Sequence, residues 1–114
     1  MSLRLTPDIL AAAYEFVRVT PPFKGWKLPH PDDVGFHVIR DKGAYGDFRV
    51  IDGLPTIRIS ENCVGHTQTL IAKMAHECIH LRQHLTGDKE VHGARFKAAA
   101  KRVCKYHGFD PKTF

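Results

Sequence analysis

The stretch AHECIHLRQHLTG, residues 75–87, carries three histidines at four-residue spacing: His76, His80 and His84. Apolar residues recur at helical spacing around it, so the sequence predicts a helix over residues 67–86 that ends at Gly87. On this helix the histidines form one stripe with Glu77 at its edge. The opposite face is apolar and holds Leu70, Ile71, Met74, Ala75, Cys78, Leu81 and Leu85. We therefore expect the helix to run through the core, with its polar stripe lining a cleft.

The first two histidines of the stripe are suited to bind one metal ion. His76 and His80 lie about 6 Å apart along the helix axis, so two imidazole nitrogens can each meet one zinc ion at about 2.0–2.1 Å. Glu77 points beside them, and we expect it to act on a water molecule as general base rather than to bind the ion. Chance would give about 0.02 H-E-x-x-H matches in a chain of this composition. The motif therefore predicts a metal-dependent hydrolase.

The third ligand must come from outside this pair. His84 lies about 12 Å from His76 along the axis, so we expect it beside the site or in solvent. Beyond Gly87, five extended residues can reach back about 16 Å, which makes His92 the preferred third ligand. Other residues could serve in its place: Glu90, His66, His107, His30 and His37.

The rest of the chain predicts one α+β domain spanning residues 1–114. A first helix is expected over residues 6–19, with Thr6 as its cap. Three strand patterns separated by turn residues favour a small antiparallel sheet, and they cover residues 35–40, 47–51 and 56–60. A final helix is expected from about Glu90, ending at Gly108.

Composition limits the cellular context. The 114 residues are 43% hydrophobic and 25% charged, as in ordinary globular proteins. The N-terminus lacks the apolar run of a signal peptide, and no stretch approaches the length of a membrane span. The three cysteines form no CxxC pair, which argues against a disulfide framework. We therefore expect a cytoplasmic protein that does not enter a membrane.

Two motifs together resemble those of the SprT-like zinc metalloproteases, the family that includes the Spartan proteases. HECIH at residues 76–80 is followed by HGARF at residues 92–96. The opening LTPDILAAAYEFV, residues 5–17, and the TIRIS strand, residues 56–60, are also similar to the layout of that family. The resemblance extends from about residue 5 to residue 109.

The resemblance implies a zincin-like fold with a long active-site helix, and one zinc ion per chain. On this basis the zinc ligands are His76, His80 and His92, and Glu77 is the general base. Many relatives carry a cysteine-based zinc ribbon after the protease domain, and this sequence shows none. We therefore expect a stand-alone catalytic domain.

The expected reaction is hydrolysis of a peptide bond in a protein or peptide substrate. An extended substrate can pair with an exposed strand edge, and the TIRIS strand, residues 56–60, is our candidate because it leads into the metal helix. A group that stabilises the oxyanion is also needed. The sequence offers four candidates: Tyr45, His84, Arg95 and Tyr106.

Charge is concentrated near the C-terminus. Residues 88–114 carry seven Lys or Arg and three acidic residues, and so hold +4 of the net charge of +5. One basic stripe on the final helix consists of Lys97, Lys101 and Lys105. This stripe predicts weak binding to DNA phosphates, and the family resemblance makes DNA-associated proteins a natural substrate class. The alternative function is a non-catalytic zinc-binding module that binds nucleic acid through this helix.

Overall fold

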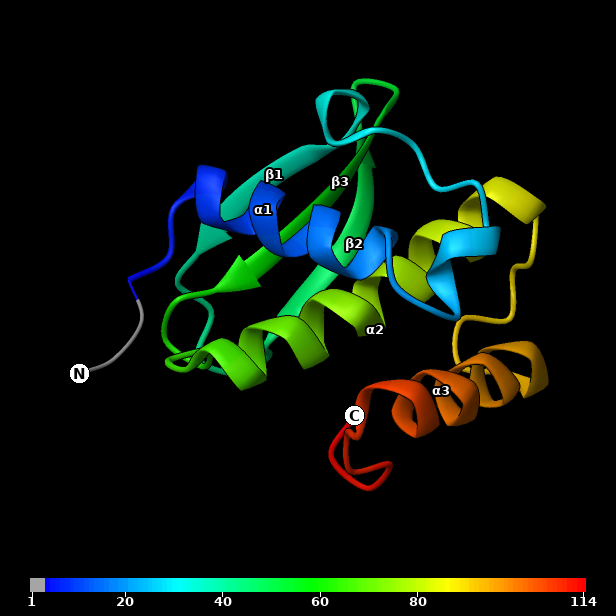
Figure 1. Cartoon of the computed structure of the whole chain (residues 1–114). Coiled ribbons are helices and arrows are strands. Elements are labelled where there is room, and N and C mark those ends of the chain that lie inside the picture. Colours follow the sequence, from blue (N-terminus) through cyan, green and yellow to red (C-terminus); the bar gives the residue numbers. More distant parts are fainter. Residues whose placement is uncertain (1–3) are drawn as a thin grey trace.

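The helices and strands follow the hydrophobic periodicity of the sequence, and a computed structural model describes them for residues 4–114 (Figure 1). The fold is α+β, as predicted. The main elements are α1 (Pro7–Arg18), β1 (Gly35–Ile39), β2 (Gly46–Ile51), β3 (Leu54–Ser60), α2 (Thr67–Thr86) and α3 (Ala94–His107). Short 3-10 turns occupy Phe23–Gly25 and Pro31–Asp33.

Helix α1 begins at the predicted cap. The Thr6 hydroxyl accepts a hydrogen bond from the Ile9 amide at 3.2 Å, and Pro7 occupies the first turn, where its missing N–H costs nothing. The buried positions of the helix recur at helical spacing and are Leu10, Ala13, Tyr14 and Val17. One face of α1 is thus buried in the core.

The sheet is mixed, and the prediction of an antiparallel sheet is wrong for one strand pair. The strand order is β1-β3-β2, with β2 antiparallel and β1 parallel to β3. The link between β1 and β2 crosses the end of β3 instead of forming a hairpin. It is held there by backbone bonds from Ser60 to Tyr45 and from Glu61 to Ile39. Consequently β3 is the central strand.

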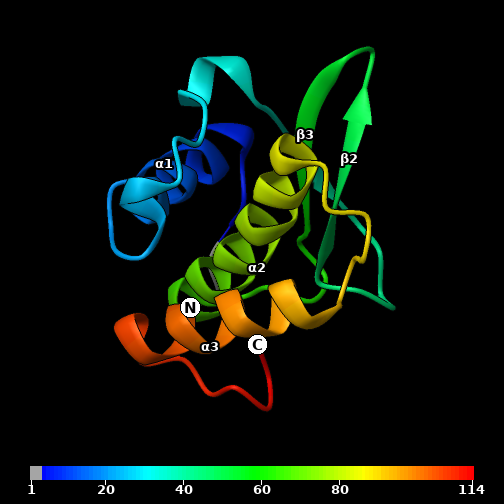
Figure 2. The same cartoon turned by 90° about the vertical axis from the view of Figure 1, so that its right-hand side faces the viewer.

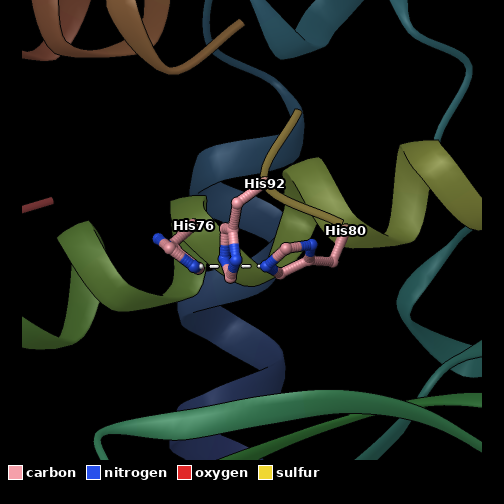
Figure 3. A group of neighbouring side chains, drawn as sticks. All are labelled: His76, His80 and His92. Carbon is pink, nitrogen blue, oxygen red and sulfur yellow. Dashed lines mark hydrogen bonds between the residues drawn. The ribbon is translucent and has the colours of Figure 1, made fainter. Parts of the chain in front are cut away.

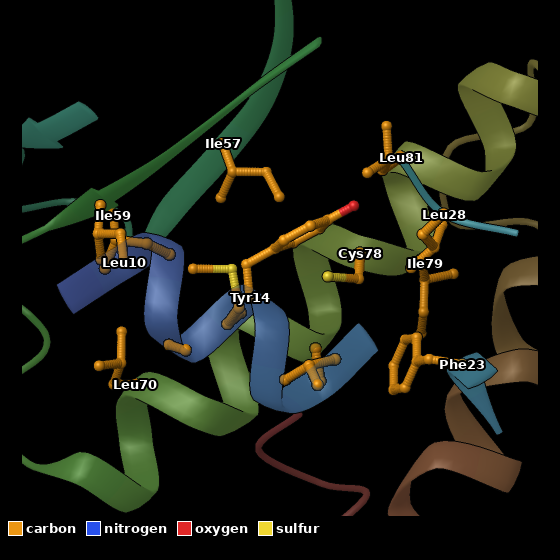
Figure 4. Packing of buried hydrophobic residues seen from close by; sticks show 14 of the residues in the cluster. Leu10, Tyr14, Phe23, Leu28, Ile57, Ile59, Leu70, Cys78, Ile79 and Leu81 are labelled. Atoms are coloured by element: carbon orange, nitrogen blue, oxygen red, sulfur yellow. The ribbon is translucent and has the colours of Figure 1, made fainter. Parts of the chain in front are cut away.

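The core lies between one face of this sheet and helices α1 and α2. Figure 4 shows the Tyr14 ring between Ile57 of β3 and Cys78 of α2, all three fully buried. The Tyr14 hydroxyl donates to the Pro29 carbonyl at 2.7 Å, which satisfies its polar end. Helices α1 and α2 pack together against the sheet, and α3 packs against α2 (Figure 2). The central position of α2 confirms that it runs through the core.

Helix α2 spans the predicted residues and ends where expected. Gly87 adopts a left-handed conformation with φ of 76°, which glycine accommodates without strain. Helix α3 begins at Ala94, four residues later than predicted, because a tight turn precedes it: the Gly93 amide donates to the Glu90 carbonyl at 2.9 Å. No helix within residues 4–114 is long and apolar enough to cross a membrane.

Candidate metal centre

Three histidines converge at the surface of α2. His76 and His80 project from successive turns of the helix, and His92 approaches from the segment before α3 (Figure 3). One ring nitrogen from each of the three lies within 4.8 Å of the others. The Nε2 atoms of His76 and His80 are 3.2 Å apart. This cluster is able to bind a metal ion.

The turn that carries His92 has a strict steric requirement. A Cβ atom at Gly93 would lie 2.7 Å from both Cβ and Oε2 of Glu90, which is closer than real Cβ contacts. Glycine therefore permits the chain to turn tightly here and enter α3. The Phe96 ring, one turn into that helix, lies 4.8 Å from the rings of both His80 and His92. His92 is thus placed by a backbone turn on one side and an aromatic ring on the other.

Gln83 determines which nitrogen of His80 faces the cluster. Its side-chain amide donates to Asp88 Oδ2 at 3.1 Å and to the Glu90 carbonyl at 3.0 Å. Both partners are acceptors, so the amide oxygen must face the other way, where it lies 2.8 Å from His80 Nδ1. His80 therefore carries its proton on Nδ1, and its Nε2 lone pair points into the cluster.

His76 is oriented in the same manner. Its Nδ1 lies 2.8 Å from the Phe114 carbonyl, which can only accept a hydrogen bond. Two lone pairs, on the Nε2 atoms of His76 and His80, therefore face each other with no proton between them. Tetrahedral zinc with bonds of about 2.0–2.1 Å requires its nitrogens to lie about 3.3 Å apart, close to the 3.2 Å seen here. The spacing of the His76 and His80 nitrogens thus fits a zinc ion, and His92 offers a third nitrogen within 4.8 Å of both.

The electrostatic environment keeps these imidazoles neutral. Burial lowers the pKa of His76 to about 4, and the neighbouring His80 and His92 reinforce the effect. Burial also lowers the pKa of His80. A metal ligand must be unprotonated, so the local environment keeps both nitrogens available for an ion at neutral pH.

Glu77 lies in the wall of the same cleft and is only 5% exposed. Burial, followed by the negative charge of Asp47, raises its pKa to about 8, and Lys73 opposes this shift. The hydrogen bonds found within residues 4–114 leave its carboxylate without a protein donor. In its ionised form, a buried carboxylate without such a donor can accept a hydrogen bond from a water molecule in the cleft.

The cleft has a volume of about 390 Å³, and its walls come from two parts of the chain. The histidine side is formed by α2 and the segment before α3. The opposite side is formed by Gly46, Asp47 and Phe48 of β2, which is an edge strand. The prediction that the TIRIS strand provides the exposed edge is wrong, because β3 is paired on both sides.

The structure also separates the remaining sequence candidates. His84 lines the cleft, 5.7 Å from the Phe48 ring, but it is not part of the three-histidine cluster. Of the other possible oxyanion groups, Tyr45 lies under Lys73, Arg95 lines a different cavity and Tyr106 is 61% exposed. The alternative third ligands lie outside the cluster: Glu90, His66, His107, His30 and His37.

Two features of the site were missed from the sequence. Gln83 could have been found because it lies three residues after His80, a spacing at which helical side chains meet. The contact of Phe114 with His76, with ring centroids 5.4 Å apart, had no comparable signal since the residues are distant in sequence.

No curated protein matches the chain, but one family model does. The sequence model of the SprT-like family matches residues 32–114, which include α2 and all three clustered histidines. Because this match covers more than half of the sequence, the chain belongs to the SprT-like family.

Proposed function

We propose that this protein is a zinc-dependent metallopeptidase. The SprT-like family is generally of the metalloprotease type, which supports hydrolysis of peptide bonds. The observation that carries the proposal is the pair of opposed Nε2 lone pairs on His76 and His80, with His92 beside them. The three histidines hold the zinc, and Glu77 remains free to act as a base.

Zinc bound by three histidines supplies Lewis acidity to a water molecule and to a peptide carbonyl. The chain itself handles the proton. Glu77 accepts it on a carboxylate oxygen as the water attacks the carbonyl carbon, and then donates it to the departing amine. Of the candidate oxyanion groups, His84 is favoured because it lines the cleft. We assign it the role of donor to the carbonyl oxygen.

The substrate lies extended between the histidines and β2. As an edge strand, β2 has unpaired backbone groups on its outer side, which can pair with an extended peptide. On the inner side of this strand, glycine is required at position 46 by the pairing with β3, since a Cβ atom there would lie 2.2 Å from the Arg58 carbonyl oxygen. The strand wall thus adds main-chain recognition that does not depend on substrate sequence.

Substitution of Glu77 tests the proposal. Glu77→Gln keeps the size and polarity of the side chain but removes the base, so we expect zinc content to remain unchanged. Cleavage of an unfolded test protein should fall by about 100-fold or more, since general-base catalysis contributes 10²–10⁴. The matched control is Glu61→Gln, because Glu61 is an exposed partner of Arg40. Equal cleavage by Glu77→Gln and wild type would refute the mechanism.

A non-catalytic nucleic-acid-binding zinc module is the second candidate. It is favoured by the lysine stripe, which we define as Lys97, Lys101 and Lys105; all three are exposed on α3. Such a stripe can meet a phosphate backbone without reading bases. If the protein is a metallopeptidase, the same stripe directs it to proteins that are bound to DNA. The absence of any cleavage by zinc-loaded wild type would favour the module.

A further inference from the structure

A second cavity, of about 380 Å³, lies between α2 and α3. Three arginines line it: Arg82 from α2, and Arg95 and Arg102 from α3. Gln83 and Asp88 also line it, and both line the histidine cleft as well. The two cavities therefore share one wall, which is built from this hydrogen-bonded pair.

The spacing of residues on α3 explains the shape of the cavity. Arg95 and Arg102 are seven residues apart, which places them on one face about 10 Å from each other. Ala98 and Ala99 lie between them and also line the cavity. Their short side chains leave space below the two guanidinium groups. The cavity is therefore lined by arginine side chains and is not filled by large apolar ones.

Within residues 4–114 the guanidinium groups of this cavity form no ion pair, although the Asp88 carboxylate lines the same cavity. Elsewhere in residues 4–114, the arginines that form ion pairs are Arg18, Arg40, Arg49 and Arg58. None of the three cavity arginines has a carboxylate oxygen of residues 4–114 within 4.0 Å. An arginine presents up to five N–H donors, so many donors converge on the cavity without an acceptor from the described chain.

Contacts with neighbouring residues hold Arg82 and Asp88 in place at this cavity. The Cζ atom of the Arg82 guanidinium lies over the Trp26 ring, 4.2 Å from its centroid, in a cation–π contact. Arg82 and Arg102 carry the same charge and line the same cavity, so the two cations repel one another. The carboxylate of the cavity, Asp88, already accepts hydrogen bonds from Gln83 and from the Glu90 amide.

We propose that this cavity is a binding site for a phosphate-type oxyanion. Planar guanidinium groups donate two parallel hydrogen bonds to phosphate oxygens, and an anion relieves the repulsion among the three cations. Most of the lysine stripe lies on another face, because Lys97 and Lys101 are roughly 100–160° around α3 from Arg95 and Arg102, while Lys105 is nearer at roughly 60–80°. The anion of the cavity can be a free phosphate compound or a phosphodiester of a nucleic acid, and both share this chemistry.

Side-chain NMR of Arg82 gives a local readout that phosphate bound in the histidine cleft does not imitate. Inorganic phosphate is titrated at constant ionic strength while the Nε–Hε signal of Arg82 is followed. We expect a saturable shift in the wild type. Removal of two donors in Arg95→Gln/Arg102→Gln should weaken binding by about tenfold or more, because charge-assisted hydrogen bonds are roughly twice as strong as neutral ones.

The matched control is Lys97→Gln/Lys101→Gln, which removes the same number of charges from exposed positions on another face of the same helix. It should leave phosphate binding nearly unchanged. Equal weakening in both variants would mean that net charge alone attracts the anion, and the proposed site would be wrong. An Arg82 signal that does not move in wild type with phosphate or with an oligonucleotide would also overturn it.

A short single-stranded oligonucleotide distinguishes the two sources. If it shifts the Arg82 signal, competes with phosphate and loses affinity in the arginine variant, the site binds a nucleic-acid backbone. If phosphate alone shifts that signal, the site serves a free phosphate compound. Either outcome supports the cavity as an anion site. Oligonucleotide binding that depends only on the lysine stripe, together with an unmoved Arg82 signal, would count against it.

Discussion

Replacement of Gln83 by leucine should weaken zinc binding although Gln83 does not contact the ion. The leucine keeps much of the side-chain volume at this buried position, which is 7% exposed. It removes the acceptor for His80 Nδ1 and both donors to the segment before α3. The imidazole of His80 would then be free to rotate or to change tautomer, and the segment that carries His92 would lose two of its anchors.

The structure gives two separate magnitudes for this change. Partners that orient a metal-binding histidine contribute 10–100-fold in metal affinity, or about 1.4–2.7 kcal/mol. Three hydrogen bonds at about 0.5–1.5 kcal/mol each give a loss of about 1.5–4.5 kcal/mol in the stability of the metal-free protein. Gln83→Glu separates the two effects, because it keeps an acceptor for His80 and loses both donors. We expect it to retain zinc but to lose stability.

Competition with a coloured chelator measures the zinc affinity, and urea unfolding of the metal-free protein measures the stability. The control is Gln68→Leu, which changes an exposed glutamine of the same helix and should alter neither quantity. If Gln83→Leu binds zinc as tightly as wild type, the amide does not orient His80, and the tautomer argument fails. If it loses affinity and Gln83→Glu does not, the argument stands.

Three further predictions follow from the site, the surface and the sheet. His92→Ala should lose zinc during dialysis and His84→Ala should retain it, because only His92 lies in the cluster; metal analysis showing the reverse would refute the ligand assignment. Replacement of the lysine stripe by glutamates should abolish DNA binding without affecting zinc content. Fluorescence anisotropy at about 20 mM salt, where screening is weak, checks this, and wild type that fails to bind would exclude the stripe. The hydrogen bond from Arg58 lowers the pKa of Asp47, so the pair contributes stability that is complete above about pH 4 and is lost as the pH falls through the lowered value. Asp47→Asn should therefore be less stable at pH 7 and lose less stability in acid, as urea unfolding at both pH values measures; an unchanged acid dependence would exclude the pair as its cause.

Local patterns were sufficient to predict the helical part of the site. The spacing of His76 and His80, the edge position of Glu77 and the break at Gly87 all depend on residues within one or two turns of each other. Leu85 is an exception on this helix: it falls on the predicted apolar face yet is 48% exposed. The last turn of α2 extends past the core, so periodicity alone could not show that its apolar side chain meets solvent.

The sheet could not be predicted in the same way, because its order depends on contacts between distant residues. The six residues from Arg40 to Tyr45 are compatible with a hairpin, and nothing in their composition excludes one. Their path across the end of β3 is fixed by Asn62, whose side chain donates to the Arg40 carbonyl at 2.6 Å, and by Ser60, whose hydroxyl donates to the Asp41 carbonyl. Such pairings become visible only when the chain is folded.

The separation of the two cleft walls has an evolutionary consequence. Every clustered histidine and Glu77 lie within residues 76–92, whereas the wall that faces them belongs to β2. Under the proposed function, mutations in residues 46–48 would change which substrates fit without disturbing the histidine cluster. Selection would then act on specificity and on chemistry through different parts of the gene, so new substrates would be acquired while the proposed catalytic group is preserved.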